Sequence, residues 1–177
     1  MAVFAVAGDD DDIIHAGVKH LADFLHMLGN PVAVIDSTGS TSMTRSLNLS
    51  YPLGILDVQR TLAVCAEDGV AAVIIAMNNA TLQREALESV NVDVLGSERV
   101  AQGEDVASLK TRYAFVSDRA LALTVPTGES DELAAESPAM FDQDRLGHMS
   151  LAVAMVLAAG VRRNNGGSAL LVANNLR

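Results

Sequence analysis

The chain has 177 residues, of which 50% are apolar and only 3% aromatic. This length suits one well-packed domain, and its core must come from aliphatic side chains because there is no Trp. The 22 acidic and 12 basic side chains give a formal net charge of −10, which repels phosphate backbones and anionic lipids. We therefore expect neither nucleic acid nor a membrane as a partner.

The sequence carries no signal for export or membrane insertion. Residues 1–8 are apolar but lack the length and the basic flank of a signal peptide. The longest apolar run, 149–161, is shorter than the roughly 20 residues of a membrane span. Cys65 is the only cysteine, which excludes an internal disulfide and fits a reducing compartment. We expect a cytoplasmic protein.

Strands and helices alternate through the first half of the chain. The apolar run 2–7, ended by Gly8, predicts a buried strand. Apolar residues then recur every three or four positions and predict a helix that ends at Gly29. We interpret the four Asp at 9–12 as the N-cap and first turn of this helix, because a metal site needs converging oxygens. A second buried strand spans 32–35, and the small polar loop 36–42 is expected to open a short helix.

Further elements follow in the same order. A helix begins after Pro52 and ends at Gly69, a strand spans 70–75, Leu82, Ala86 and Val90 mark a helix, and a strand spans 92–95. The second half predicts a helix near 106–111, strands near 113–116 and 120–125, a surface loop at 127–139, a long helix at 145–160, a turn at 162–167 and a last strand at 169–173.

This alternation predicts an α/β fold with three layers, in which helices cover both faces of a mostly parallel sheet. Residues 1–30 are interpreted as a leader strand and helix, and residues 31–177 as the main domain.

Ligands of open parallel sheets bind at the carboxyl ends of the strands, so the loop 36–42 is the most informative candidate site. Its small residues are typical of an anion cradle at a helix start. A phosphate loop usually reads G-x-x-x-x-G-K-[ST], however, and here Gly39 is the only glycine, no Lys follows and Asp36 adds a negative charge. Two interpretations stay open, a phosphate-binding loop and an ordinary turn capped by Ser and Thr.

Other catalytic patterns are missing from the sequence. Three of the four histidines lie on the first helix, where His20 is expected beside a core position and His15 and His26 are expected to face solvent. No metal-ligand spacing is present, so no metal site is predicted. Cys65 lies on the apolar side of its helix and is interpreted as a structural thiol.

Four stretches together resemble the Mur ligase family. HAGVKHLADFLHMLGNPVAVIDSTGSTSMTRSL is similar to the join between its first and central domains, where an Ala-rich helix leads to a strand and to T-G-T-N-G-K-T-T-T. LDVQRTLAVCAEDGVAAVIIAM, LQREALESVNVDVL and HMSLAVAMVLAAGV follow in the family's order, so the resemblance covers about residues 12–161. The most similar branches are the UDP-N-acetylmuramoyl-tripeptide synthetases and the ligase half of cyanophycin synthetase.

The resemblance implies a P-loop NTPase-like central domain that binds ATP and Mg²⁺ for amide ligation. The nucleotide site would then comprise Thr38, Gly39, Ser40, Thr41, Ser42 and His148. Several positions depart from the family pattern: Thr41 replaces the phosphate-loop Lys, Ser37 and Ser40 replace its glycines, and Ala76 replaces the metal-binding Glu. Ser42 keeps the hydroxyl that binds magnesium, and His148 stands for the Asn beside the adenine.

These departures favour a degenerate, non-catalytic member that needs no cofactor. It would act as a binding, scaffold or regulatory module with a protein partner or as a homo-oligomer, linked to peptidoglycan or cyanophycin-type amide ligation. The alternative is an ATP-dependent acid–amino acid ligase, or a ligase subunit, with an atypical phosphate loop that still uses ATP and Mg²⁺.

Overall fold

The computed structural model describes residues 1–8, 10–98, 105–136 and 143–163. The elements in these ranges are β1 (Ala2–Ala7), α1 (Asp11–Met27), β2 (Val32–Ile35), β3 (Ser40–Ser42), β4 (Arg45–Leu47), α2 (Ile55–Glu67), β5 (Ala72–Ala76), β6 (Val94–Ser97), α3 (Val106–Tyr113), β7 (Leu123–Thr124), α4 (Gly128–Ala134) and α5 (Gln143–Ala158). None of the helices in the described ranges has the length and apolar character needed to cross a membrane.

The strands form one sheet in the order β4-β3-β2-β5-β1-β6-β7. The five strands from β2 to β7 in this order are parallel, and β3 and β4 add an antiparallel hairpin at one edge. In β1, Phe4 lies opposite Ile74 on one side and Val94 on the other. The predicted α/β class with a mostly parallel sheet is therefore confirmed. Residues 1–30, predicted as a leader, supply the strand between β5 and β6 and share the sheet with the rest of the chain.

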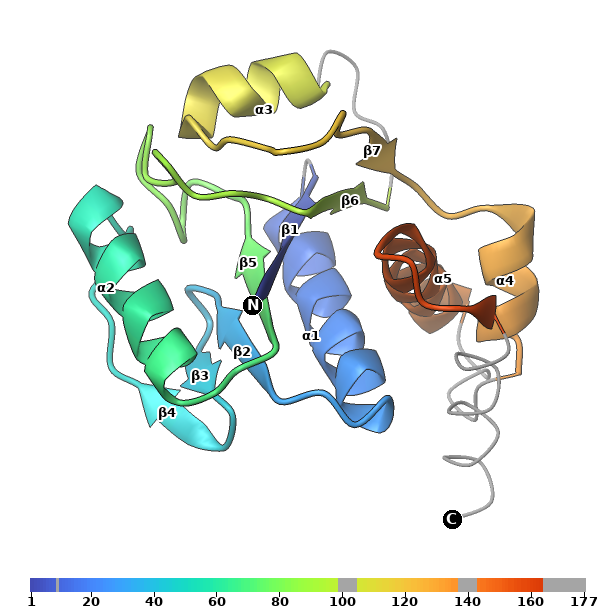
Figure 1. Cartoon of the computed structure of the whole chain (residues 1–177). Coiled ribbons are helices and arrows are strands. Elements are labelled where there is room, and N and C mark those ends of the chain that lie inside the picture. The colour runs from blue at the N-terminus through green and yellow to red at the C-terminus, as the bar shows by residue number, and fades with distance from the viewer. Residues whose placement is uncertain (9, 99–104, 137–142, 164–177) are drawn as a thin grey trace.

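Helices lie on both faces of the sheet, and a separate apolar core fills each side (Figure 1). One core packs α2 and α3 against the sheet, and the other packs α1, α4 and α5 against the opposite face. Residues of β1 alternate between them: Val3, Ala5 and Ala7 enter the first core, and Phe4 and Val6 enter the second. This two-residue period is the property of a strand that is buried on both faces.

Helix α1 follows from its sequence as expected. Asp10 is its N-cap, and the carboxylate accepts a hydrogen bond of 2.8 Å from the backbone N–H of Asp12. Gly29 has a φ of +80°, a conformation that glycine adopts without strain at the end of a helix. Gly17 lets the helix approach the sheet, because a Cβ there would lie 3.3 Å from Val6. The structure also confirms the predicted strands that correspond to β1, β2, β5 and β6 and the predicted helices that correspond to α2, α3 and α5.

The expected helix after residue 42 is wrong, because the chain turns back as the hairpin β3–β4. The carbonyl of Asp36 accepts a hydrogen bond from the N–H of Gly39 (3.0 Å), and its carboxylate accepts one from the N–H of Thr38 (3.0 Å). Met43, with a φ of 55°, makes the next turn and donates its N–H to the carbonyl of Val32 (2.9 Å). The hydrogen bonds of the turn from Asp36 to Gly39 thus form in place of those of a helix start.

The predicted helix over Leu82–Val90 is also wrong. Glu85 and Ser89 have positive φ values of 61° and 64°, and the segment forms consecutive turns. The N–H groups of Glu85 and Leu87 donate to the carbonyls of Arg112 (2.9 Å) and Tyr113 (3.0 Å) instead of to their own preceding turn. Backbone partners from a distant segment therefore replace the helical hydrogen bonds.

The second half differs from its prediction in three places. The predicted strand at 113–116 is reduced to a single bridge between Asn91 and Val116, and that at 120–125 is reduced to β7. The predicted loop 127–139 contains α4, whose N-cap Thr127 accepts from the N–H of Ser130 (3.2 Å). Thr127 as an N-cap, with Glu129 in the first turn, was a helix signal in the sequence. The predicted last strand at 169–173 lies outside the described residues.

Candidate functional site

The strand order defines where a ligand crevice is expected. From β1 the chain crosses to β2 on one side of it, whereas from β6 it continues to β7 on the other side. Open α/β sheets bind their ligands at such a reversal, outside the carboxyl ends of the two strands. Here Gly8 follows β1 and Glu98 follows β6, so these two residues border the expected crevice.

The helix that begins at this crevice carries carboxylates at its start. Gly8 connects β1 to the first turn of α1, which holds Asp11 and Asp12 after the N-cap Asp10. A phosphate at this position would need free N–H groups and positive charge. The carboxylate of Asp10 already accepts a hydrogen bond from the N–H of Asp12. The positive end of the helix dipole also stabilises the neighbouring carboxylates, which would repel a phosphate. The chain therefore fills its own helix N-terminus with negative charge.

His148 lies at the same edge through its contact with Glu98, the residue that follows β6. Its Nδ1 is 2.6 Å from Oε2 of Glu98, and the two side chains are only 12% and 13% exposed. Gly147 makes room for this pair, since a Cβ there would lie 2.5 Å from Oε1 of Glu98. The ring of His20 on α1 lies 5.4 Å from that of His148. The crevice is thus bordered by imidazoles and carboxylates.

The remaining predicted site residues lie at the end of β2. Thr38 and Gly39 form the turn, and Ser40–Ser42 is β3. Strands are spaced about 4.8 Å apart, so β2 and β6 are separated by three spacings, or roughly 14 Å. The structure therefore brings the predicted loop residues together but does not bring His148 to them.

Two hydroxyls of this loop are used inside the fold. The Oγ of Ser40 accepts from the N–H of Asp36 (2.9 Å) and contacts the hydroxyl of Tyr51. The Oγ of Ser42 donates to Oδ2 of Asp68 (2.5 Å), which also accepts from Nη2 of Arg45 (2.6 Å). The magnesium-binding role that the family resemblance implies for Ser42 has to compete with this carboxylate.

The outer side of the turn borders a cleft of about 400 Å³ between α1 and the β2–β3 turn. The polar lining residues are His15, Lys19, Asp23, Asp36, Thr38 and Thr41, and Gly39 also borders the cleft. Three predicted residues, Thr38, Gly39 and Thr41, thus line one cleft. It combines one ammonium group with two carboxylates and an imidazole, so it suits a small polar ligand of mixed charge better than a polyphosphate.

The expectation that His15 faces solvent is wrong, whereas His26 is exposed as expected. Nδ1 of His15 lies 2.7 Å from Oδ1 and 2.8 Å from Oδ2 of Asp36. The carboxylate is nearly buried, at 4% exposure, and the imidazole is 18% exposed. A carboxylate in this position orients the ring and favours a proton on Nδ1, which leaves Nε2 as the nitrogen able to accept a hydrogen bond. No sequence motif links these residues; the packing of α1 beside β2 brings them together.

Burial changes the acidity of two side chains, Tyr51 and Cys65. Burial raises the pKa of Tyr51, an effect that the hydrogen bond with Ser40 opposes and the charge of Asp36 reinforces. Burial also raises the pKa of the Cys65 thiol, in agreement with the predicted structural role. Within the described ranges, no group of three or more His, Cys, Asp or Glu is arranged to hold a metal ion.

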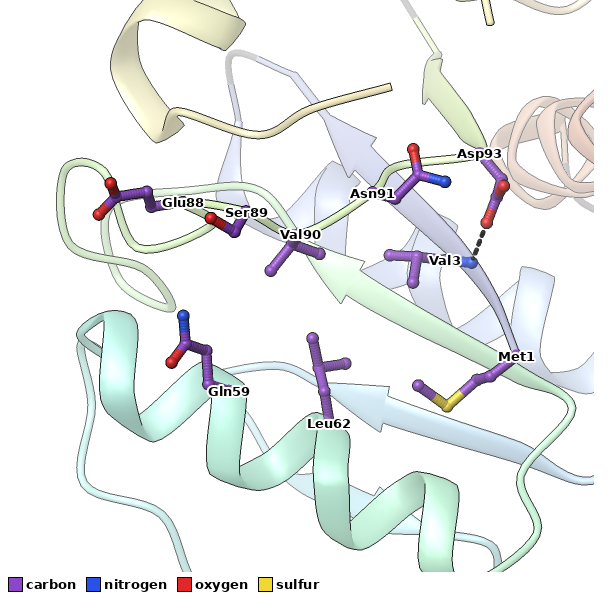
Figure 2. Close-up of a pocket in the computed structure, with 9 residues that line it drawn as sticks. All are labelled: Met1, Val3, Gln59, Leu62, Glu88, Ser89, Val90, Asn91 and Asp93. Atoms are coloured by element: carbon purple, nitrogen blue, oxygen red, sulfur yellow. Dashed lines mark hydrogen bonds between the residues drawn. The ribbon is translucent and has the colours of Figure 1, made fainter. Parts of the chain in front are cut away.

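A different hollow of about 340 Å³ lies between α2 and the start of β1 (Figure 2). Figure 2 shows Gln59 rising from α2 toward Ser89 and Leu62 toward Val90, and Asp93 accepting a hydrogen bond from the N–H of Val3 (2.8 Å). Val3 is the second residue of β1 and Asp93 precedes β6, so this hollow lies at the amino ends of the strands. Ligands of open parallel sheets bind at the opposite edge.

No protein-family model matches the chain, and no curated protein sequence matches it.

Proposed function

We propose that this chain is a degenerate, non-catalytic Mur ligase-like domain that acts as a binding or regulatory module. It would associate with a protein partner, such as an active ligase, or with further copies of itself, in peptidoglycan or cyanophycin-type amide ligation. The sequence resemblance and the α/β class with a mostly parallel sheet support this assignment. The observation that carries the non-catalytic part is the acidic start of α1 at the strand-order reversal.

The chemistry of phosphoryl transfer explains why this observation matters. Activation of a carboxylate by ATP depends on positive charge that surrounds the transferred phosphoryl group. At the start of α1 the chain offers Asp10, Asp11 and Asp12, and Asp10 occupies one of the N–H groups that would receive a phosphate. The turn after β2 offers no helix start either, because β3 follows it.

An ATP titration tests this proposal. We expect isothermal titration calorimetry of the full chain with ATP to give no saturable heat that depends on Mg²⁺. Millimolar ATP with Mg²⁺ should likewise leave Tm unchanged, because only a ligand that binds the folded state raises it. Saturable, Mg²⁺-dependent binding would instead support the alternative, an ATP-dependent ligase or ligase subunit.

A charge-reversal pair tests the role of the acidic start. Asp12→Lys places a cation in the first turn of α1, and Asp23→Lys makes the same charge change farther along the helix. We expect Mg²⁺-dependent ATP affinity to increase in Asp12→Lys and not in Asp23→Lys. An equal increase in both variants would mean that total charge, and not the helix start, disfavours the nucleotide.

The association part of the proposal has a separate readout. Sedimentation equilibrium should give a mass above that of one 18.5 kDa chain, or affinity purification from the native extract should recover a defined ligase. A monomer that recovers no ligase would count against a binding module.

A further inference from the structure

A hollow of about 510 Å³ lies beside α3, at the carboxyl end of β5. It is lined by Asn79, Arg84, Ser108, Thr111 and Arg112. Among the described residues, the lining includes two guanidinium groups and no carboxylate, although the chain as a whole carries a net charge of −10. This local reversal of charge distinguishes the hollow from the cleft at His15 and from the acidic start of α1.

Backbone hydrogen bonds hold the two arginines at one mouth. Arg84 lies in the turns after β5, and Arg112 lies in the last turn of α3. The N–H of Glu85 donates to the carbonyl of Arg112 (2.9 Å), and the N–H of Leu87 donates to that of Tyr113 (3.0 Å). Glu85 keeps a positive φ of 61° in this arrangement, which is unfavourable for a residue with a side chain. The juxtaposition of the arginines thus depends on a specific backbone conformation.

Among the neutral side chains that line the hollow, the amide of Asn79 offers hydrogen-bond donors to a ligand. The hydroxyls of Ser108 and Thr111 donate to the carbonyls of Asp105 and Ala107 (both 2.8 Å), so their protons are already used. Asn79 accepts at Oδ1 from the hydroxyl of Tyr113 (3.5 Å), which leaves its amide N–H groups as donors.

The arginines themselves have no carboxylate partner among the described residues. The described ion pairs involve His15, Arg45, His148 and Arg163 but neither Arg84 nor Arg112. The guanidinium of Arg112 lies 6.0 Å from the ring centroid of Tyr113, a contact that leaves its N–H groups free to bind. The helix dipole favours a cation at the end of α3 and so accounts for Arg112, but Arg84 lies outside that helix.

We propose that this hollow binds a small oxyanion-bearing ligand, a phosphate or carboxylate compound, through Arg84, Arg112 and the amide of Asn79. Guanidinium groups present several N–H donors in a plane and pair with oxyanions in a bidentate manner. The hollow does not include the start of α1, so binding of an anion here would not depend on Mg²⁺ or on a phosphate loop. The inference is independent of the function proposed above.

Isothermal titration calorimetry with inorganic phosphate and with succinate, at fixed ionic strength and with EDTA present, tests the site and separates the two ligand sources. We expect saturable binding of at least one anion by the full chain. Arg84→Gln and Arg112→Gln should each weaken it about tenfold or more, as expected for loss of roughly 1.5–3 kcal/mol of charge-assisted hydrogen bonding. Arg60→Gln on α2 is the matched control, because Arg60 is exposed and lies outside the hollow.

Two outcomes would overturn the site. One is the lack of saturable binding of either anion by the wild type, and the other is unchanged binding in the Arg84→Gln/Arg112→Gln double variant. Both arginines are exposed, so the variants should keep the wild-type Tm without anion. EDTA keeps this test separate from the ATP titration, where only Mg²⁺-dependent binding counts.

Discussion

Nδ1 of His15 lies within 2.8 Å of both carboxylate oxygens of Asp36, although 21 residues separate them in the sequence. Asp36 also accepts a hydrogen bond from the N–H of Thr38 (3.0 Å). One nearly buried carboxylate therefore joins α1 to the end of β2 and fixes the turn that precedes β3.

Removal of this carboxylate should destabilise the fold. We expect Asp36→Ala to lower the free energy of unfolding by about 1–3 kcal/mol, because it leaves His15 and the N–H of Thr38 without their partner. Asp36→Asn should cost less, since its amide oxygen can still accept from Thr38. Urea unfolding measures both. Asp23→Ala, at an exposed carboxylate of the same cleft, is the control, and an equal loss in Asp23→Ala would contradict the assigned role of Asp36.

Tyr51 should contribute stability that is lost in alkali. Burial raises its pKa in the folded state, so the folded protein binds the phenolic proton more tightly than the unfolded chain does. The resulting stabilisation is complete below the ordinary tyrosine pKa of about 10 and falls as pH rises through the higher folded value. In unfolding experiments across this range, Tyr51→Phe should show a smaller alkaline loss than the wild type. Cys65 is present in both proteins, so the difference isolates Tyr51; parallel curves would sink the prediction.

Cys65 should resist thiol reagents in the folded protein. Its side chain is fully buried, and burial raises the pKa of the thiol, so the reactive thiolate is scarce at neutral pH. We expect labelling by a disulfide reagent to be slow under native conditions and rapid in guanidinium chloride, which exposes the same thiol. Rapid native labelling at a rate independent of added denaturant would show that α2 opens readily and that Cys65 is not a core residue.

The sequence predicts the elements that local patterns determine. Apolar runs identify β1, β2 and β5, and the N-cap Asp10 together with Gly29 marks the bounds of α1. These features need only neighbouring residues. The same holds for the buried position of Cys65, which follows from the apolar spacing of its helix.

The parts that sequence reasoning misses depend on partners far along the chain. Glu85 and Leu87 are expected in a helix by spacing, but carbonyls of residues 112 and 113 receive their N–H groups. The strand order cannot be read from the sequence either, and it is this order that makes the start of α1, and not the loop after β2, the expected position for phosphate. The contact between His15 and Asp36 likewise follows from the packing of two elements.

The close approach of α5 to β6 should depend on Gly96 and Met155. A Cβ on Gly96 would lie 2.7 Å from Cγ of the fully buried Met155, so Gly96→Ala should cost about 1–3 kcal/mol by overpacking. Met155→Ala alone should cost about 2–5 kcal/mol through the cavity it leaves. In the double variant the new methyl group enters that cavity, so the summed losses should exceed the measured loss by about 0.5–3 kcal/mol.

Gly128→Ala is the matched control for this cycle. A Cβ at Gly128, in the first turn of α4, meets nothing within 4 Å, so this variant should be neutral or slightly stabilising. Urea unfolding of the four proteins measures the coupling. Strictly additive losses in the double variant would mean that the methyl group at residue 96 does not use the cavity left by Met155→Ala, and that α5 shifts to accept it in the single variant. His148 would then move away from Glu98, because the same helix carries it toward the end of β6.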